Sequence, residues 1–429
     1  MKELFKRTVV SILTFEAKLL LKRVNPKIIG ITGSVGKTST KDAIYAVLKN
    51  HVHARKSDKS FNSDIGVALT ILGLPNAWSN PLMWAKEIFD GLMHALFPGD
   101  YPDVLVLEMG VDRPGDMKRL TEWIKPDIAV VTRLPDVPVH VEFFSSPEEV
   151  IAEKMILVAA LKQDGVFIYN NDDEKIRPYV EETRQQSFGF SRYSQSHFMA
   201  TGDSVLYDGA TPIGIEFDVT HVEESAHAIV RGSVGIQHVY TYAAAMAVGS
   251  LFDISLKEAA EALSVSVPPP GRMRLVPGIL GTTIIDDTYN SSPVACEHAI
   301  QTLSEIKSTG RRIAVLGDML ELGQYSVREH ERIGELAASR VSILMTLGVR
   351  ARKIADGAKA YGLPEGSVLQ YDDQEQLSAD LRANLKPHDI VLIKASQGMR
   401  AERIVAAVMA EPQKAPELLV RQEAIWEKK

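Results

Sequence analysis

The sequence predicts an α/β protein with two mostly parallel sheets, the first of which carries a small β appendage. Its 429 residues exceed one ordinary domain of roughly 100–200 residues. Apolar strand patterns alternate with helical ones along most of the chain. The prolines at 268–270 divide this alternation, because proline neither continues a helix nor donates a hydrogen bond to a sheet. We therefore expect domains over residues 27–270 and 271–429, after an N-terminal helix over residues 1–26.

The first 24 residues are predicted to form an amphipathic helix. Apolar residues recur near helical spacing, while Lys and Arg interrupt every apolar run. The segment therefore lacks the uninterrupted apolar span of a signal sequence or transmembrane helix, and stable membrane insertion is not expected. Such a helix can dock on its own domain, which we favour, or lie on a membrane surface.

Strand and helix patterns follow one another in the first domain. The predicted strands are Lys27–Thr32, Asp103–Glu108, Ile128–Thr132 and Val166–Tyr169, and the predicted helices are Thr38–Lys49, Pro147–Leu161, His238–Phe252 and Leu256–Leu263. Short alternating runs rich in Thr, Val, Ile and Gly between Phe188 and Val230 predict the β appendage. This order is typical of a doubly wound sheet.

A second alternation begins after the proline linker. The predicted strands are Thr283–Asp287, Arg312–Leu316, Ser342–Leu347 and Ile390–Ile393, with helices between them. This pattern predicts a compact Rossmann-like domain. The charged tail from Glu411 is expected to fray.

Charge and cysteine content exclude several classes of protein. A formal charge of −7 offers no basic excess for non-specific nucleic-acid binding, so nucleic acid is not an expected partner. The single cysteine, Cys296, excludes an intramolecular disulfide and a cysteine-based zinc site. It fits a reducing compartment, so we expect a cytoplasmic protein.

One string combines a strand end, a glycine turn and a helix start: Thr32, Gly33, Ser34, Val35, Gly36, Lys37, Thr38 and Ser39. Glycines let backbone N–H groups approach phosphate oxygens, and the helix N-terminus favours negative charge. Lys37 is expected to reach the β and γ phosphates of ATP, and the Thr38 hydroxyl to bind Mg²⁺. Position 31 is Ile where the general P-loop pattern has Gly. The first domain is nevertheless predicted to be a P-loop ATPase domain that binds ATP and Mg²⁺.

Further candidates stand at strand ends and after the linker. Glu108 ends an apolar strand, where a carboxylate could hold a metal ion that bridges phosphates. Arg272 follows the linker and could swing onto the γ-phosphate as the two domains close. Asp287 is expected to accept the ribose hydroxyls of ATP, while Tyr289 and Asn290 line the cleft between the domains.

Several strings resemble those of the Mur ligases, the amide ligases of peptidoglycan-precursor synthesis, whose relatives include folylpolyglutamate synthetase. They are TGSVGKTST from Thr32, FNSDIGVALTIL from Phe61, VLEMGVDRPGDM from Val106, DDTYNSSP from Asp286, RRIAVLGDMLELG from Arg311 and KASQGMRAE from Lys394. Their combination resembles the MurF type, the D-alanyl-D-alanine-adding enzymes. The resemblance runs from about Lys27 to Val408 and so covers both predicted domains.

The resemblance implies a mechanism and a set of site residues. ATP would phosphorylate the terminal carboxylate of a muramyl-tripeptide, and the amine of D-Ala-D-Ala would attack the acyl phosphate, a step in building the cell wall that sets cell shape. Glu108 and His140 would bind Mg²⁺, and a carbamylated Lys154 would organise a second Mg²⁺. Arg272 would contact the γ-phosphate. The residues implied to be catalytic are Lys37, His140, Lys154 and Arg272.

One departure leaves alternatives open. MurF-type enzymes begin with a separate domain that holds the UDP end of the substrate, whereas 26 residues precede the first predicted strand here, so that domain is expected to be lacking. The chain could therefore be a Mur-like ligase that joins another amino acid or peptide to a different carrier. It could also be a non-catalytic nucleotide-binding subunit. A monomer is expected in each case.

Overall fold

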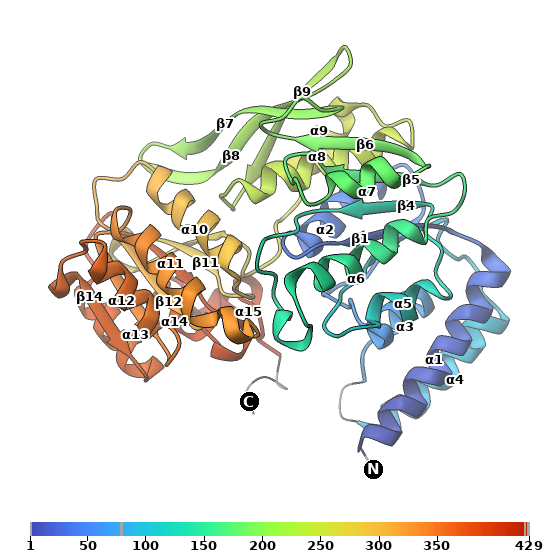
Figure 1. Cartoon of the computed structure of the whole chain (residues 1–429), viewed down its shortest axis with the longest axis horizontal. Coiled ribbons are helices and arrows are strands. Elements are labelled where there is room, and N and C mark those ends of the chain that lie inside the picture. Colours follow the sequence, from blue (N-terminus) through green and yellow to red (C-terminus); the bar gives the residue numbers. More distant parts are fainter. Residues whose placement is uncertain (1, 78–79, 424–425, 427–429) are drawn as a thin grey trace.

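The computed structural model describes residues 2–77, 80–423 and 426. Its helices and strands form two lobes, each built on one sheet (Figure 1). We call the part from α1 to α9 the first lobe and the part from β10 to α15 the second lobe. The predicted α/β class with two mostly parallel sheets is confirmed.

The sheet of the first lobe has nine strands in the order β2-β3-β1-β4-β5-β6-β7-β8-β9. Their bounds are β1 Lys27–Thr32, β2 Ala54–Lys56, β3 Val104–Glu108, β4 Ile128–Val131, β5 Val166–Asn170, β6 Gln186–Ser191, β7 Phe198–Asp208, β8 Thr211–His221 and β9 Glu224–Arg231. Neighbours from β2 to β7 pair in parallel, and β7, β8 and β9 pair antiparallel. Because parallel strands end at the same edge, β1, β3 and β4 present their C-terminal residues together.

Helices cover both faces of this sheet (Figure 1). Their bounds are α1 Lys2–Val24, α2 Lys37–Leu48, α3 Asp64–Leu72, α4 Pro81–Leu96, α5 Asp116–Thr121, α6 Pro147–Ala159, α7 Arg177–Glu182, α8 Gln237–Ser250 and α9 Leu256–Ser264. Side chains alternate between the two faces of a strand. Ile29 and Ile31 of β1 join the core with α2 and α8, whereas Ile28 joins the core with α3 and α6.

The predicted β appendage is part of the main sheet. Residues 188–230 do form β-structure, but β6 pairs in parallel with β5 and with β7, so the sheet continues without a break. The reason lies in buried aromatic side chains. Phe190, Phe198 and Phe217 join the same core as α8, and the Phe217 ring lies edge-on to Tyr242 at 6.1 Å.

The N-terminal helix α1 docks on its own lobe. Val9, Leu13, Ala17 and Leu20 recur every three or four residues and are buried against α3 and α4. Within the described part of the chain, no helix is long and apolar enough to cross a membrane.

The sheet of the second lobe has six strands in the order β10-β11-β15-β12-β13-β14. The strands are β10 Arg274–Pro277, β11 Thr283–Asp287, β12 Arg312–Gly317, β13 Ile343–Leu347, β14 Val368–Tyr371 and β15 Ile390–Lys394, and the helices are α10 Pro293–Glu305, α11 Ser326–Ala338, α12 Arg352–Ala360, α13 Gln374–Asn384, α14 Glu402–Val408 and α15 Ala415–Leu418. All neighbours pair in parallel except β10, which pairs antiparallel with β11. Five parallel strands alternating with helices match the Rossmann-like pattern expected of this region.

The expectation that the tail from Glu411 frays is wrong as far as residue 423. Leu419 is buried in the core of the second lobe. The Arg421 guanidinium is buried too, where it forms an ion pair with Glu402 at 2.9 Å and donates to the carbonyl of Thr288. The charge content of the segment was therefore a poor guide, because Leu419 and Arg421 are held inside the fold.

Candidate active site

The loop between β1 and α2 has the geometry of a phosphate-binding loop. Gly33 and Gly36 adopt positive φ angles of 136° and 88°, which favour glycine. A Cβ at Gly33 would lie 2.1 Å from Thr132 Oγ1, so no other residue fits there. The first turn of α2 begins at Lys37 and leaves backbone N–H groups without partners inside the helix. These N–H groups and the helix dipole together favour an anion.

A neighbouring strand holds this loop in place. The Thr132 hydroxyl, just after β4, lies 2.7 Å from the Val35 carbonyl and 3.2 Å from that of Thr32. The Ser34 N–H donates to the Arg133 carbonyl at 2.7 Å. The loop is therefore pinned before any ligand binds, so binding need not order it.

Oxygen ligands gather at the start of α2. The parallel register places Ile31 beside Glu108, so the carboxylate at the end of β3 faces the loop. The Thr38 hydroxyl donates to Glu108 Oε2 at 2.9 Å and lies 2.7 Å from Ser60 Oγ, while Asn62 Nδ2 donates to Glu108 Oε1 at 3.3 Å. A hydroxyl and a carboxylate are ligands that Mg²⁺ prefers when phosphates complete its shell. These residues fit Mg²⁺ bound together with a nucleotide.

These oxygens do not form a preformed metal cage. Within the described residues, no group of three or more His, Cys, Asp or Glu side chains is close enough to hold a metal ion. A divalent ion would therefore depend on phosphate oxygens, as Mg²⁺ sites in nucleotide-binding proteins commonly do.

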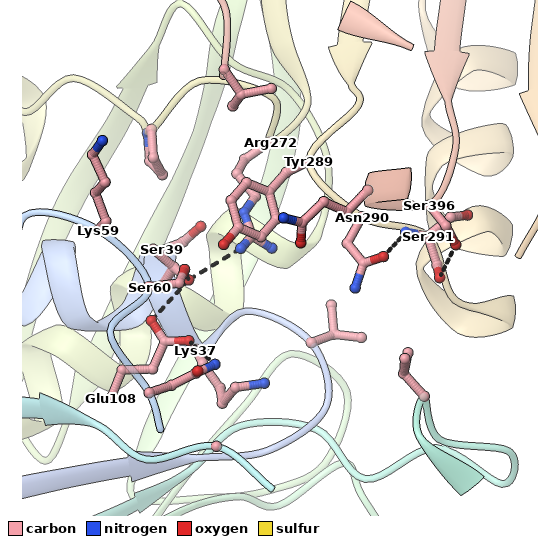
Figure 2. Close-up of a pocket in the computed structure, with 18 of the residues that line it drawn as sticks. Lys37, Ser39, Lys59, Ser60, Glu108, Arg272, Tyr289, Asn290, Ser291 and Ser396 are labelled. Atoms are coloured by element: carbon pink, nitrogen blue, oxygen red, sulfur yellow. Dashed lines mark hydrogen bonds between the residues drawn. The ribbon is translucent and has the colours of Figure 1, made fainter. Parts of the chain in front are cut away.

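Arg272 connects the two lobes across the cavity. It donates to Thr38 Oγ1 at 3.1 Å, and its guanidinium lies 4.0 Å from the centre of the Tyr289 ring. Figure 2 shows Glu108 and Lys37 on one side of the cavity, with Arg272, Tyr289 and Asn290 on the other. The guanidinium is thus held beside the predicted phosphate site by a side chain from each lobe.

Two lysines lie near one another beside the loop. Desolvation lowers the pKa of Lys37, which donates to the Gly33 carbonyl at 2.9 Å; the nearby Glu108 charge raises it and Arg272 lowers it. Lys154, on α6, is buried, and burial followed by the charge of Lys37 lowers its pKa to about 7. Within the part of the chain that the structure describes, Lys154 has no ion pair. A polyphosphate in this cavity would stabilise the Lys37 ammonium.

His140 lies at the edge of the same cavity, between carboxylates. Its Nδ1 is 2.7 Å from Glu321 of the second lobe, and its Nε2 is 3.3 Å from Asp112. Each ring nitrogen thus lies close to a carboxylate, although Nδ1 is buried without a well-aligned hydrogen bond. Its predicted role as a metal ligand stays a prediction, and would require one of these carboxylates to move.

Asp287 is paired within the second lobe. Its Oδ2 lies 2.6 Å from the buried Lys394 ammonium, and its Oδ1 accepts from the Met273 N–H at 3.2 Å. Lys394 also donates to the carbonyl of Asn290 at 2.9 Å. A ribose hydroxyl at Asp287 would share an oxygen with these donors, so nucleotide binding by this residue remains a prediction.

Nearly all of the predicted site residues line one cavity of about 930 Å³. They are Ser34, Val35, Gly36, Lys37, Thr38, Ser39, Glu108, His140, Lys154, Arg272, Asp287, Tyr289 and Asn290. Thr32, at the end of β1, and Gly33, the first residue of the loop, do not line it. Cavities of several hundred cubic ångströms are typical of small-molecule sites.

Other functional candidates were missed from the sequence. Ser60 and Asn62 contact Thr38 and Glu108, yet neither belongs to the loop motif. Lys41, one helical turn after Lys37, is fully buried, and donates to the carbonyls of Ser57 and Lys59 at 2.6 and 3.0 Å. Lys41 thereby holds the segment that carries Ser60 and Asn62. The string FNSDIG around Asn62 was the available signal, but nothing in it indicates which side chain turns toward Glu108.

The fold and the cavity define an enzyme class. A phosphate loop on one lobe faces an arginine and a tyrosine at the entrance to a second, Rossmann-like lobe. This arrangement is that of a two-lobed nucleotide-using enzyme in which chemistry occurs between the lobes.

Comparison with known proteins identifies the family. Residues 31–249 match the Mur ligase middle domain, and residues 271–397 match the Mur ligase, glutamate ligase domain. The chain belongs to the Mur ligase family and is an ATP-dependent ligase.

Two relatives carry the same name. The UDP-N-acetylmuramoyl-tripeptide–D-alanyl-D-alanine ligase of Bacillus subtilis strain 168 is 29% identical over 405 residues, which cover 92% of this chain and 79% of the relative. The ligase of the same name from Mycobacterium tuberculosis strain H37Rv is 30% identical over 403 residues, covering 90% and 73%.

Two solved structures share the fold of this chain. The MurF ligase of Thermotoga maritima in complex with ADP superposes with a TM-score of 0.77 at 25% identity, covering 94% of this chain and 84% of that one. Folylpolyglutamate synthase of Mycobacterium tuberculosis, complexed with ADP, shares the fold with a TM-score of 0.62 at 16% identity, covering 92% and 94%.

Proposed function

We propose that this ligase uses ATP and Mg²⁺ to join D-alanyl-D-alanine to the terminal carboxylate of a UDP-N-acetylmuramoyl-tripeptide, through an acyl phosphate. The observation that carries the proposal is the shared cavity. The loop at residues 34–39 and Glu108 line its first-lobe side, while Tyr289 and Asn290 line its second-lobe side. The names of the relatives indicate the two substrates.

In the first step, a carboxylate oxygen of the tripeptide attacks the γ-phosphorus, and the bond to ADP breaks. Negative charge spreads over the transferring phosphoryl oxygens in the transition state. The N–H groups at the start of α2 and the Lys37 ammonium would hold the phosphates, and the Arg272 guanidinium would bind the γ-phosphoryl group. Arg272 already lies 3.1 Å from the Thr38 hydroxyl, at the start of this helix.

Thr38 and Glu108 are the residues that would hold Mg²⁺. When bound, Mg²⁺ neutralises charge on the phosphates. Ser60 and Asn62 would keep the Thr38 hydroxyl and the Glu108 carboxylate in place, since each hydrogen-bonds to one of them. We propose that Lys154 becomes carbamylated. Burial lowers its pKa to about 7, so near neutral pH a substantial fraction of the amine is unprotonated, which is the form that reacts with carbon dioxide.

In the second step, the amine of the dipeptide attacks the acyl carbon, loses a proton, and inorganic phosphate leaves. The second lobe would bring the dipeptide to the acyl phosphate. Ser396 and Gln397, at the end of β15, line the cavity beside Asn290 and are the dipeptide contacts we propose. Closure of the lobes would exclude water, which otherwise hydrolyses the acyl phosphate.

We infer that the reaction takes place in the cytoplasm, where ATP is available. A monomer fits a site formed by two lobes of one chain, because both sides of the cavity come from the same molecule.

Phosphate release tests this assignment. The protein, ATP and Mg²⁺ are incubated with UDP-N-acetylmuramoyl-tripeptide, with and without D-alanyl-D-alanine, and the products are weighed by mass spectrometry. We expect phosphate release and a pentapeptide product only with both substrates. If phosphate is released only when another carrier or another amino acid replaces these substrates, the ligase joins that carrier or amino acid instead. If no combination of substrates gives phosphate release, ligase activity is refuted.

A further inference from the structure

The helices α1 and α4 expose large apolar side chains far from the cavity. Leu82, Phe89 and Phe97 on or just after α4 are 84%, 62% and 69% exposed, and Phe15 on α1 is 64% exposed. Single exposed apolar residues are ordinary, but several on two adjoining helices indicate a contact surface. We call the outer faces of α1 and α4 the helical face.

Apolar residues of α4 lie on its exposed side as well as on its buried side, unlike those of an ordinary surface helix. Such a helix buries its apolar side and exposes its polar side. The buried side of α4 consists of Trp84, Glu87, Gly91 and Ala95, whereas its exposed side carries the larger apolar side chains of Leu82, Phe89 and Leu92. The packing of α4 within the first lobe does not account for this arrangement. An apolar environment outside the chain would.

The charged side chains of α1 indicate what kind of surface would contact these helices. The exposed basic residues of α1 are Lys6, Arg7, Lys18, Lys22 and Arg23. None of them pairs with an acidic side chain among the residues that the structure describes. Glu16, the one acid of α1 whose side chain is described, is buried. The helical face is therefore basic on a chain whose formal charge is −7.

The acids of α4 do not offset this charge. Asp90 pairs with Lys86 at 2.6 Å, and Glu87 is buried. Unpaired lysines and arginines beside exposed Phe, Leu and Met side chains match the boundary between anionic headgroups and acyl chains. Protein interfaces are depleted of lysine, so the exposed Lys6, Lys18 and Lys22 of α1 favour a lipid surface over a protein partner.

The position of the helical face leaves the enzyme free to work. Figure 1 shows α1 and α4 side by side at one end of the molecule, with the second lobe at the other end. A surface that held α1 and α4 would not cover Arg272 or Tyr289, which line the cavity between the lobes.

We propose that the helical face docks the enzyme on an anionic lipid bilayer. Leu82, Phe89 and Phe97 enter the headgroup region, and the basic residues of α1 lie against lipid phosphates. This is peripheral binding, which adds a location to the ligase reaction and does not depend on which acceptor the enzyme uses.

Co-sedimentation of the full chain with vesicles tests the proposal. We expect binding to phosphatidylcholine vesicles that contain about 30% phosphatidylglycerol, weak binding to pure phosphatidylcholine, and release as NaCl rises from about 0.05 M to about 0.5 M. The variant Leu82→Ser/Phe89→Ser should bind at least about tenfold more weakly, and Lys18→Glu/Lys22→Glu should lose the preference for anionic lipid. Val349→Ser, at a residue 70% exposed in the second lobe, is the matched control and should bind as the parent does.

Three results would overturn the proposal. The first is the absence of vesicle binding, and the second is vesicle binding that the Leu82→Ser/Phe89→Ser variant retains in full. The third is a concentration-dependent dimer, seen by sedimentation velocity without lipid and abolished by the same variant, which would assign the helical face to a second copy of this chain. Melting temperatures within a few degrees of the parent would verify that these exposed substitutions leave the fold intact.

Discussion

Replacing Arg272 tests whether a residue held between the lobes stabilises the transferring phosphoryl group. In this structure the guanidinium donates to Thr38 at 3.1 Å and lies 4.0 Å from the Tyr289 ring centre. With ATP bound, we expect the guanidinium to turn two N–H donors toward the γ-phosphoryl oxygens. Hydrogen bonds to charged groups contribute about 1.5–3 kcal/mol each, so two of them amount to about 3–6 kcal/mol in the transition state.

That free energy sets the expected loss of rate. Arg272→Ala should lower kcat by about 10²- to 10⁴-fold, since about 1.4 kcal/mol corresponds to a factor of ten. Arg272→Lys keeps the charge but not the planar pair of donors, so it should recover only part of the loss. The folded protein loses one hydrogen bond and one cation–π contact, together about 1–3 kcal/mol, so both variants should still fold.

Steady-state ADP release, measured by a coupled spectrophotometric assay, gives kcat, and a thermal melt of each variant shows whether it folds. Glu321→Gln serves as a comparison, because it alters another contact between the lobes, that of Glu321 in the second lobe with His140 in the first. A kcat for Arg272→Ala within about threefold of the parent would refute the role assigned to the guanidinium.

Three further predictions concern other charged groups. Lys37→Ala should abolish ADP release while leaving the fold intact; turnover equal to the parent would contradict the role of the loop. Lys154→Ala should be inactive with or without added bicarbonate, and ¹³C-bicarbonate should give the parent, but not the variant, a carbamate signal by NMR; an unlabelled but active parent would refute carbamylation. Burial raises the pKa of Glu16 from 4.5 to about 7, so the folded state keeps a proton that the unfolded chain releases, and unfolding becomes easier as the pH rises through this window. Glu16→Gln removes this dependence. The free energy of unfolding of the variant minus that of the parent, measured by chemical denaturation, should therefore be up to about 3 kcal/mol larger at pH 8 than at pH 4.5. An equal difference at both pH values would count against the prediction.

The parts of the fold that follow from sequence are those with strong local signals. Buried parallel strands such as Lys27–Thr32 and Ile390–Lys394 are mainly apolar runs, so their type was predictable and their bounds were predictable to within a residue. The short strands Ala54–Lys56 and Arg274–Pro277 were not predicted. They have three and four residues, which is too few to show an alternation of apolar and polar residues. They form because a neighbouring strand offers hydrogen bonds.

Within the site, the predictable residues are those in the backbone motif. Glycine at positions 33 and 36 follows from the positive φ angles that the loop requires. The contact of Ser60 with Thr38 depends on the fold, because 22 residues separate the two. The pairing of Asp287 with Lys394 joins residues 107 positions apart. The sequence placed both residues at strand ends, but only the structure shows that they form an ion pair with each other.

The helical face shows another limit of sequence patterns. The period of α1 correctly indicated an amphipathic helix, and docking on the first lobe is what the structure shows. The outward-facing Phe89 could not be predicted, because the side of a helix that faces the core is decided by its neighbours. The two alternatives for α1 are docking on its own lobe and contact with a membrane surface. They are compatible, because one side of α1 is buried against the lobe and the other side is exposed.

The central claim is that the γ-phosphoryl group passes to a carboxylate before the amide bond forms. Ligation with a tripeptide whose terminal carboxylate carries ¹⁸O tests it most directly, with mass spectrometry of the phosphate released. The acyl-phosphate route predicts one ¹⁸O atom in each inorganic phosphate, because the carboxylate oxygen that attacks phosphorus leaves with it. Phosphate without the label, or label in AMP, would contradict it.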